Sequence, residues 1–209
     1  MKLAFIGIGK VGFALAHRLE KAGHEIIVAH DNPQSGSVLK AQAQNPNFTV
    51  APVQKAIDQA DAVFLAIPFF SVKDLLEGLH FQGKPLIDCT NPVGPGIKHG
   101  LESKISGAEK VAQWAVDAKV VKSYTIYGFE NLEDASFPKS NVKPSMFIAG
   151  DDGESKDLVS TLNHALGFET LDVGGLNQSL HLEHMTLMWV KMVRVNGHSP
   201  NLTWAALSR

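Results

Sequence analysis

Short apolar runs alternate along the chain with segments in which apolar residues recur at helical spacing. The runs 3–6 and 62–67 are continuously apolar, which is typical of parallel strands covered on both faces. After the run 3–6, Val11, Leu15 and Leu19 recur at the spacing that places them on one side of an amphipathic helix. Strands that alternate with helices in this way pair in parallel through right-handed crossovers. The pattern therefore predicts an α/β fold with a doubly wound, Rossmann-type parallel sheet, extended by C-terminal strands and helices.

The same pattern predicts elements along the whole chain. Strands are expected at 2–6, 26–28, 48–50, 62–67, 85–89, 120–124, 146–149 and 169–173. Helices are expected at 11–22, 38–44, 52–60, 71–79, 108–118, 154–166 and 178–195. The polar segment 128–144 is long for a connector, and in a compact domain such segments are more often functional lids.

A glycine-rich turn follows the first predicted strand. Gly7, Gly9 and Gly12 form a G-x-G-x-x-G pattern between this strand and the first helix. In dinucleotide-binding turns the first glycine permits the tight turn, the second lets the backbone approach a pyrophosphate, and the third lets helix and strand pack closely. Asp31 follows the second strand at roughly the 20-residue distance at which an acid meets the adenosine ribose. Together these features predict NAD(P) binding, whereas a glycine triplet alone would fit an ordinary βα turn.

The predicted strands place further candidate residues at one edge of the sheet. Ligands of doubly wound sheets bind at the carboxyl ends of the strands. This rule gathers the glycine turn and the ends of three other strands into one cleft. The predicted cofactor-binding residues are Gly7, Ile8, Gly9, Lys10, Val11, Gly12, His30, Asp31, Asn32, Ile67, Pro68, Asn91 and Pro92.

Composition and charge narrow the class of protein. The chain has 209 residues, 44% hydrophobic content and a formal net charge of −2, which leaves no basic field for nucleic acid or anionic lipid. Its single cysteine, Cys89, cannot form an intramolecular disulfide, and in a strand it is expected to be a small buried hydrophobe. No run reaches the roughly 18 apolar residues that span a bilayer. We therefore expect a cytoplasmic protein that binds neither nucleic acid nor a membrane.

The last predicted helix is apolar on more than one side. Met185, Met188 and Trp189 belong to a set of apolar residues that cover more than one face of the segment 178–195. Such a helix packs against its own domain and against a second surface. A second copy of the chain is the simplest such surface, so the pattern favours a homodimer; the alternative is a monomer whose tail, 201–204, folds over the helix.

Four patches of the chain together resemble a known family. Residues 87–92, 120–124 and 148–152 follow the glycine turn in the order and spacing of the NADP oxidoreductases of the coenzyme-F-dependent (deazaflavin) type. These enzymes are related to the cytoplasmic domain of the six-transmembrane metalloreductases. The resemblance implies a cytoplasmic dimer in which residues 1–125 bind NADP. The smaller portion 126–209 would bind a flavin-like ring beside the nicotinamide, so that hydride passes between the two rings.

Two positions depart from that family pattern. Where NADP-using relatives have a Ser-Arg-Asn-Pro type sequence, this chain has His30-Asp31-Asn32-Pro33. An aspartate repels a 2′-phosphate but accepts hydrogen bonds from a free ribose, which favours NAD unless His30 binds the phosphate. Thr125 stands where the family has an amide facing the two rings. Asn91 and Thr125 are the nearest candidates for catalytic residues.

Other side chains have both a chemical and a structural interpretation. His181 and His184 have a helical spacing that can hold a metal if further ligands converge, but no Cys/His motif accompanies them and we predict no metal site. Lys122 either approaches a cofactor phosphate or an acidic substrate, or forms a structural salt bridge. Phe69 and Phe70 either stack on a cofactor or pack in the core.

The sequence thus supports two functions. The first is an NAD(P)-dependent oxidoreductase that transfers hydride between the nicotinamide and a flavin, a deazaflavin or a small quinone-like acceptor. The cofactor rings do the bond making in such enzymes, so little acid–base help is required. The second is a dinucleotide-binding sensor or regulatory subunit without turnover, which is favoured because no acid, base or acceptor motif stands out.

Overall fold

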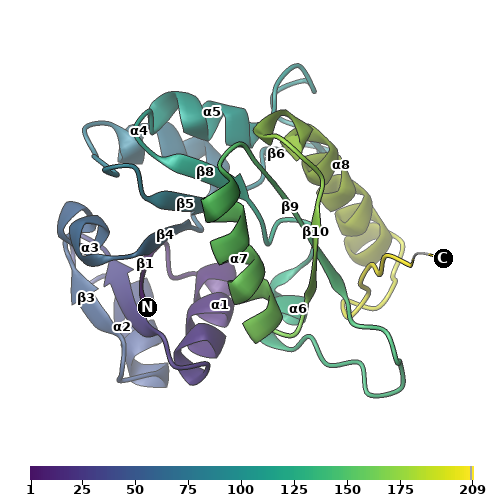
Figure 1. Cartoon of the computed structure of the whole chain (residues 1–209), viewed down its shortest axis with the longest axis horizontal. Helices are drawn as coiled ribbons and strands as arrows, with labels where there is room; N and C mark the ends of the chain where they lie inside the picture. Colours follow the sequence, from purple (N-terminus) through teal and green to yellow (C-terminus); the bar gives the residue numbers. More distant parts are fainter. Residues whose placement is uncertain (208) are drawn as a thin grey trace.

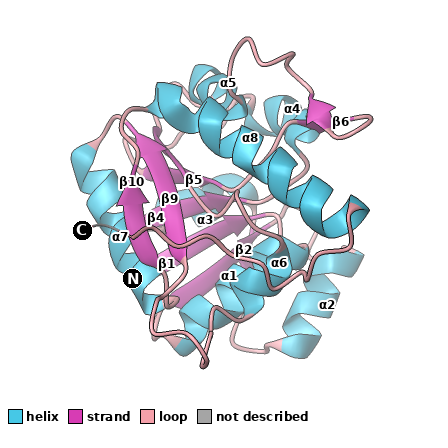
Figure 2. Ribbon diagram, turned by 90° about the vertical axis from the view of Figure 1, so that its right-hand side faces the viewer, coloured by secondary structure: helices cyan, strands magenta, loops and turns pink. Residues whose placement is uncertain are grey.

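One central sheet carries helices on both of its faces (Figures 1 and 2). The computed structural model describes residues 1–207 and 209. The sheet has eight strands in the order β10-β9-β8-β5-β4-β1-β2-β3, and the neighbours from β8 to β3 are all parallel. The chain builds outward from β1 first in one direction and then in the other, which makes the sheet doubly wound. The predicted α/β Rossmann-type fold is confirmed.

The elements begin and end close to the predicted positions. The strands of the sheet are β1 (Lys2–Ile6), β2 (Glu25–Ala29), β3 (Thr49–Ala51), β4 (Ala62–Leu65), β5 (Pro85–Asp88), β8 (Lys119–Lys122), β9 (Ser145–Gly150) and β10 (Glu169–Asp172). A separate hairpin consists of β6 (Val93–Gly94) and β7 (Lys98–His99). The helices are α1 (Lys10–Lys21), α2 (Gly36–Gln44), α3 (Val53–Gln59), α4 (Val72–Leu76), α5 (Gly107–Trp114), α6 (Phe129–Glu133), α7 (Gly153–Ala165) and α8 (Ser179–Val190). Short helical turns are η1 (Phe69–Ser71), η2 (Leu176–Gln178) and η3 (Lys191–Val195).

The sheet changes direction after β8. Strand β9 pairs antiparallel with β8, with Lys122 opposite Ala149, and β10 then pairs parallel with β9. An antiparallel partner begins at the end where its neighbour stops, so the connection 123–144 stays at the carboxyl ends of the parallel strands. The segment expected to act as a lid therefore lies on the side of the sheet where ligands bind. The boundary between 1–125 and 126–209 stays a prediction, because β9 and β10 extend the same sheet.

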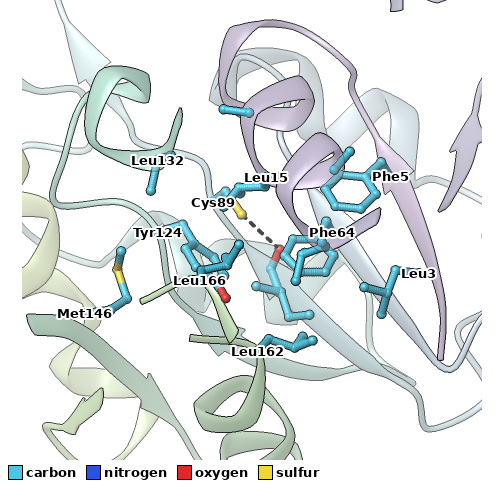
Figure 3. Close-up of a cluster of buried hydrophobic side chains, with 14 of the residues drawn as sticks. Leu3, Phe5, Leu15, Phe64, Cys89, Tyr124, Leu132, Met146, Leu162 and Leu166 are labelled. Carbon is cyan, nitrogen blue, oxygen red and sulfur yellow. Dashed lines mark hydrogen bonds between the residues drawn. The ribbon is translucent and has the colours of Figure 1, made fainter. Parts of the chain in front are cut away.

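Alternate residues of the strands fill two apolar clusters, one on each face of the sheet. On one face, Leu3 and Phe5 of β1 pack with Phe64 and with helices α1 and α7; Figure 3 shows this cluster. On the other face, Ala4 and Ile6 pack with helices α3, α4 and α5. Because every central strand is covered on both faces, it appears in the sequence as a continuous apolar run.

Two predicted helices are shorter in the structure. The helix expected at 108–118 ends at Trp114, as α5. In the helix expected at 71–79, Ser71 instead ends the 3-10 turn η1, and its side chain makes no capping bond to the described residues. Helix α4 ends early, at Leu76, because Gly78 at φ +79° turns the chain out of the helix.

The C-terminal helix α8 packs one side against the domain and exposes the other side. Leu182, Glu183 and Trp189 of α8 are buried against the domain. Met188 is 47% exposed and Val195, in the turn that follows α8, is 62% exposed. Within the part of the chain that the structure describes, no helix has the length and apolarity to cross a membrane.

Candidate functional site

The three glycines of the turn after β1 occupy different environments. Gly7 has a φ of +97°, and a Cβ built on it would lie 2.5 Å from the carbonyl oxygen of Ala66. A Cβ on Gly12 would overlap the carbonyl oxygen of Gly7. These two glycines are therefore required by the protein's own packing, between β1, α1 and the end of β4. A Cβ on Gly9 would meet no atom of the described residues within 4 Å, so Gly9 presents an open backbone face.

The N-terminus of α1 is available to an anion. Gly9 is its N-cap residue and has no side chain with which to satisfy the first N–H groups of the helix. The first turn carries no acidic side chain, so the partial positive charge of the helix N-terminus is not neutralised from within the helix. Together with the open face of Gly9, these N–H groups can receive a phosphate.

A cavity of about 420 Å³ lies beside the glycine turn at the end of β2. Asp31 lines it and is held in place by Val53, whose backbone N–H donates to Asp31 Oδ1 at 2.9 Å. Asp31 Oδ2 makes no hydrogen bond to the described residues, so it can accept one from a ribose hydroxyl. His30 Nδ1 accepts the N–H of Asn32 at 3.0 Å, which fixes its ring in the loop. His30, Asp31 and Asn32 are thus brought together as predicted.

A second cavity, of about 310 Å³, adjoins the first and shares Ala66, Ile67 and Pro68 with it. It extends from the N-terminus of α1 to the end of β5, where Thr90 and Asn91 line it. The two cavities form a trough across the carboxyl ends of β2, β1, β4 and β5, where a dinucleotide would lie in this fold. Most of the predicted cofactor-binding residues line this trough. Gly12 and Pro92 do not: Gly12 packs against Gly7, and the Pro92 carbonyl accepts the N–H of Gly100.

Asn91 is fixed by a pair of hydrogen bonds to Thr125. The Thr125 hydroxyl donates to Asn91 Oδ1 at 2.5 Å, and Asn91 Nδ2 donates to the Thr125 carbonyl at 3.2 Å. Thr186 of α8 donates its hydroxyl to the same carbonyl at 2.9 Å. Thr125 is 1% exposed and lies behind Asn91, not in the wall of the trough. Its place beside the two reacting rings stays a prediction, and the contacts show it supporting Asn91.

Thr90 is a candidate residue that the sequence interpretation missed. It lines the second cavity, and its Oγ1 is buried without a hydrogen-bond partner among residues 1–207 and 209. A buried hydroxyl without a partner is uncommon in proteins and is a group that a polar ligand can satisfy. The signal was present in the sequence, because Thr90 lies two residues after the end of β5 and next to Asn91, which was placed at this edge.

Lys122 forms a salt bridge and does not reach the trough. Its ammonium is fully buried, 2.9 Å from Asp88 Oδ2 and 3.1 Å from Glu183 Oε1. Burial alone would lower the pKa of Lys122, but the two carboxylates outweigh it and raise the pKa above its ordinary value. Of the two interpretations of this lysine, the structure shows the salt bridge.

The remaining candidates have structural roles. Burial raises the pKa of the Cys89 thiol well above its usual range, so Cys89 is protonated and behaves as a small core residue (Figure 3). Phe69 packs against Trp114 and also lines the second cavity, whereas Phe70 is 63% exposed. His184 bonds to the Ser103 hydroxyl at 2.9 Å. Among the described residues, no group of three metal-ligating side chains converges.

The segment 128–144 contacts the glycine turn through α6. Lys10 Nζ lies 4.6 Å from the centroid of the Phe129 ring, a cation–π contact. Phe129 and Glu133 line a further cavity of about 460 Å³ together with Gly9, Lys10 and residues of α2. A segment that was predicted to be a lid therefore covers the outer side of the turn that would hold the pyrophosphate.

Comparisons with known proteins identify a family model and relatives that are similar to this chain. A family described as NADP oxidoreductase, coenzyme F420-dependent, matches residues 2–92. The chain is 27% identical over 210 residues to the F420-dependent NADP reductase of Methanothermobacter marburgensis, covering 92% of each protein. It is 28% identical over 189 residues to Metalloreductase STEAP3 of Rattus norvegicus, which corresponds to 89% of this chain but only 36% of that protein.

Solved structures show the same fold. A crystal structure provisionally assigned to an F420-dependent NADP reductase of Arthrobacter sp. FB24 aligns over all of both chains with a TM-score of 0.83 and 23% identity. The protein SMa0349 of Sinorhizobium meliloti aligns with a TM-score of 0.75 and 25% identity, over 85% of this chain and 87% of that one. The resemblance noted in the sequence is confirmed. Residues 2–92 thus resemble the coenzyme F420-dependent NADP oxidoreductases, and the chain is similar over most of its length to an F420-dependent NADP reductase and to part of STEAP3.

Proposed function

We propose that the chain transfers hydride between a nicotinamide dinucleotide and a flavin, a deazaflavin or a small quinone-like acceptor. The open backbone face of Gly9 carries this proposal. Packing explains Gly7 and Gly12 but leaves open space among the described residues where a Cβ of Gly9 would lie, at the N-terminus of α1 and at the edge of the trough. Space kept free at that point fits a pyrophosphate that approaches the backbone closely. The match of residues 2–92 to an NADP oxidoreductase family supports the same nucleotide class.

Different residues of the trough would hold the two ends of the dinucleotide. Asp31 would accept hydrogen bonds from the adenosine ribose, and the N–H groups at the start of α1 would hold the pyrophosphate. Asn91, fixed by Thr125, would orient the carboxamide at the end of β5. When bound, the nicotinamide and the acceptor ring supply the hydride chemistry themselves. The protein contributes position and excludes water, which explains why no side-chain acid or base is required at the cleft.

Asp31 supports NAD as the preferred nucleotide. Its carboxylate lies in the wall of the adenosine cavity, where a 2′-phosphate would be repelled and a free 2′-hydroxyl would be accepted. The name of the reductase from Methanothermobacter marburgensis specifies NADP, so this chain would differ from that relative at this position.

Turnover with a panel of acceptors tests the proposal. We expect NADH oxidation with at least one flavin or deazaflavin acceptor, measured by the loss of absorbance of the reduced nicotinamide. A sensor without turnover is the second candidate, because the ionisable side chains that line the second cavity are Lys10 and the protonated Cys89. Tight binding of NADH and NADPH with no oxidation by any acceptor would show that the sensor is correct.

The exposed side of α8 supports a homodimer. Met188 and Val195 leave an apolar surface on the C-terminal helix, as the sequence predicted. We expect the chain to elute as a dimer in size-exclusion chromatography with light scattering, and Met188→Glu to shift it towards a monomer. A wild-type mass of one chain at micromolar concentration would contradict this. The cytoplasmic location expected from the sequence stays a prediction.

A further inference from the structure

A buried cluster of charges lies directly behind the trough. Lys122 Nζ contacts three oxygens: the Thr90 carbonyl at 2.6 Å, Asp88 Oδ2 at 2.9 Å and Glu183 Oε1 at 3.1 Å. An ammonium group has three N–H donors, so all of them are used. The side chains of Lys122 and Asp88 are 0% exposed and that of Glu183 is 1% exposed. The cluster joins β8 and β5 to the C-terminal helix α8.

Glu183 completes the cluster on the side of α8. Its carboxylate accepts the N–H groups of Gly107 and Ala108, the first turn of α5, and it bonds to His99 Nε2 at 2.8 Å. His99 Nδ1 accepts two backbone N–H groups, at 3.2 and 3.3 Å, which leaves Nε2 as the ring nitrogen that donates to Glu183. Burial alone would raise the pKa of Glu183, but Lys122 and these donors outweigh it, so the pKa is lowered and Glu183 is an anion.

Stability alone is a weak reason for such a cluster. Replacing a buried ion pair by apolar side chains of similar volume is often neutral or stabilising. The contacts converge instead on one residue of the trough. Asp88 Oδ1 accepts the Thr90 N–H at 2.9 Å while Lys122 donates to the Thr90 carbonyl, so both peptide groups of Thr90 are held. The next residue is Asn91, which lines the second cavity.

We propose that Lys122 is a positioning residue for the nicotinamide end of the site. Its ammonium fixes the turn of Thr90 and Asn91 against β5 and, through Glu183, fixes that turn relative to α8. The adenosine end is built by Asp31 and Val53 in the other cavity, which Lys122 does not contact. This inference rests on the proposed dinucleotide site, and it assigns the lysine a role in orienting the ligand without contact to it.

The two ends of the ligand allow the role to be measured by binding alone. ADP-ribose has the adenosine and pyrophosphate groups of NADH but no nicotinamide, so the ratio of the two affinities reports on the nicotinamide end. In Lys122→Met, calorimetry or fluorescence titration should show NADH affinity falling about tenfold, the loss of roughly one hydrogen-bonded contact, with ADP-ribose affinity unchanged. A merely structural lysine would not change this ratio.

Lys84→Met is the matched control. Lys84 also donates from a partly buried ammonium to two backbone carbonyls, those of Ile57 and Asp58, both at 2.7 Å, but at the C-terminal end of α3. Lys84→Met should leave the affinities for NADH and ADP-ribose as in the wild type. Because Lys122→Met leaves two buried carboxylates without a cation, the double variant Lys122→Met/Glu183→Gln provides a second test with less buried charge. It should show the same selective loss of NADH affinity.

The outcomes distinguish failure of the positioning role of Lys122 from failure of the proposed dinucleotide site. If both ligands weaken together in the Lys122 variants, or if neither weakens, the positioning role is wrong. If the wild-type chain binds ADP-ribose and NADH equally tightly, the nicotinamide end makes no net contact and the positioning role is also overturned. If the wild-type chain binds neither ligand, the proposed dinucleotide site itself fails.

Discussion

Gly9→Ala is expected to weaken dinucleotide binding about 10- to 100-fold, the cost of losing one or two charge-assisted hydrogen bonds to a phosphate. The backbone of Gly9 has φ −71° and ψ −161°, which alanine adopts without strain. Its new methyl group would meet no described protein atom within 4 Å and would occupy the space of the pyrophosphate. The midpoint of thermal unfolding should therefore stay within a degree or two of the wild type, a shift of well under 1 kcal/mol.

Gly12→Ala is the control for this variant. Its Cβ would overlap the carbonyl oxygen of Gly7, so the same substitution at this position should destabilise the fold by about 1–3 kcal/mol, as overpacking does. Calorimetry of the two variants, followed by titration with NADH and NADPH, compares the effects directly. Full NADH and NADPH affinity in Gly9→Ala would show that no phosphate approaches this turn.

Asp31→Asn is expected to change the ratio of NADH to NADPH affinity by about 10- to 100-fold in favour of NADPH. An amide still accepts the Val53 N–H through its oxygen, so the contact that holds residue 31 is kept and only the charge is removed. The repulsion that is relieved is worth about 1–4 kcal/mol for two charges 4 Å apart near a protein surface. NADH should lose affinity at the same time, because a charge-assisted bond to the ribose becomes a neutral one.

Asp31→Arg extends the same test. It also breaks the Val53 contact, so Asp31→Asn is the variant that isolates the charge. Competition titrations with both nucleotides at fixed ionic strength measure the ratio, since salt screens the repulsion. A ratio that stays the same in both variants would show that residue 31 does not face the ribose and that the preference for NAD is wrong.

Most of the fold follows from the sequence because the sheet is parallel and covered on both faces. Runs such as 62–67 are typical of buried parallel strands, and Gly23 and Gly167 mark helix ends at positive φ. The antiparallel direction of β9 could not be predicted from the apolar runs or from the glycines that end helices. A buried strand has the same composition whichever way it runs, and the connection 123–144 shows no periodicity that distinguishes a crossover from a return.

The site was predictable to the extent that it consists of strand ends. The rule that ligands bind at carboxyl ends of strands brings Gly9, Asp31 and Asn91 into one trough. The rule does not say which way a side chain turns. Thr125 lies behind Asn91 and Lys122 lies behind Thr90, because the alternation of strand residues and the approach of α8 decide their directions. Glu183 could not be assigned to the site from the sequence, since no local spacing connects it with residues on β5 and β8.

The position of Glu183 late in the chain has a consequence for synthesis. Strands β1 to β5 and Lys122 emerge from the ribosome well before α8, so the adenosine end can form while the chain is still being made. Until α8 docks, Lys122 lacks one of its carboxylates and the N-terminus of α5 lacks its anion. We therefore expect the adenosine end of the proposed site to form before its nicotinamide end, which becomes rigid only after α8 has docked.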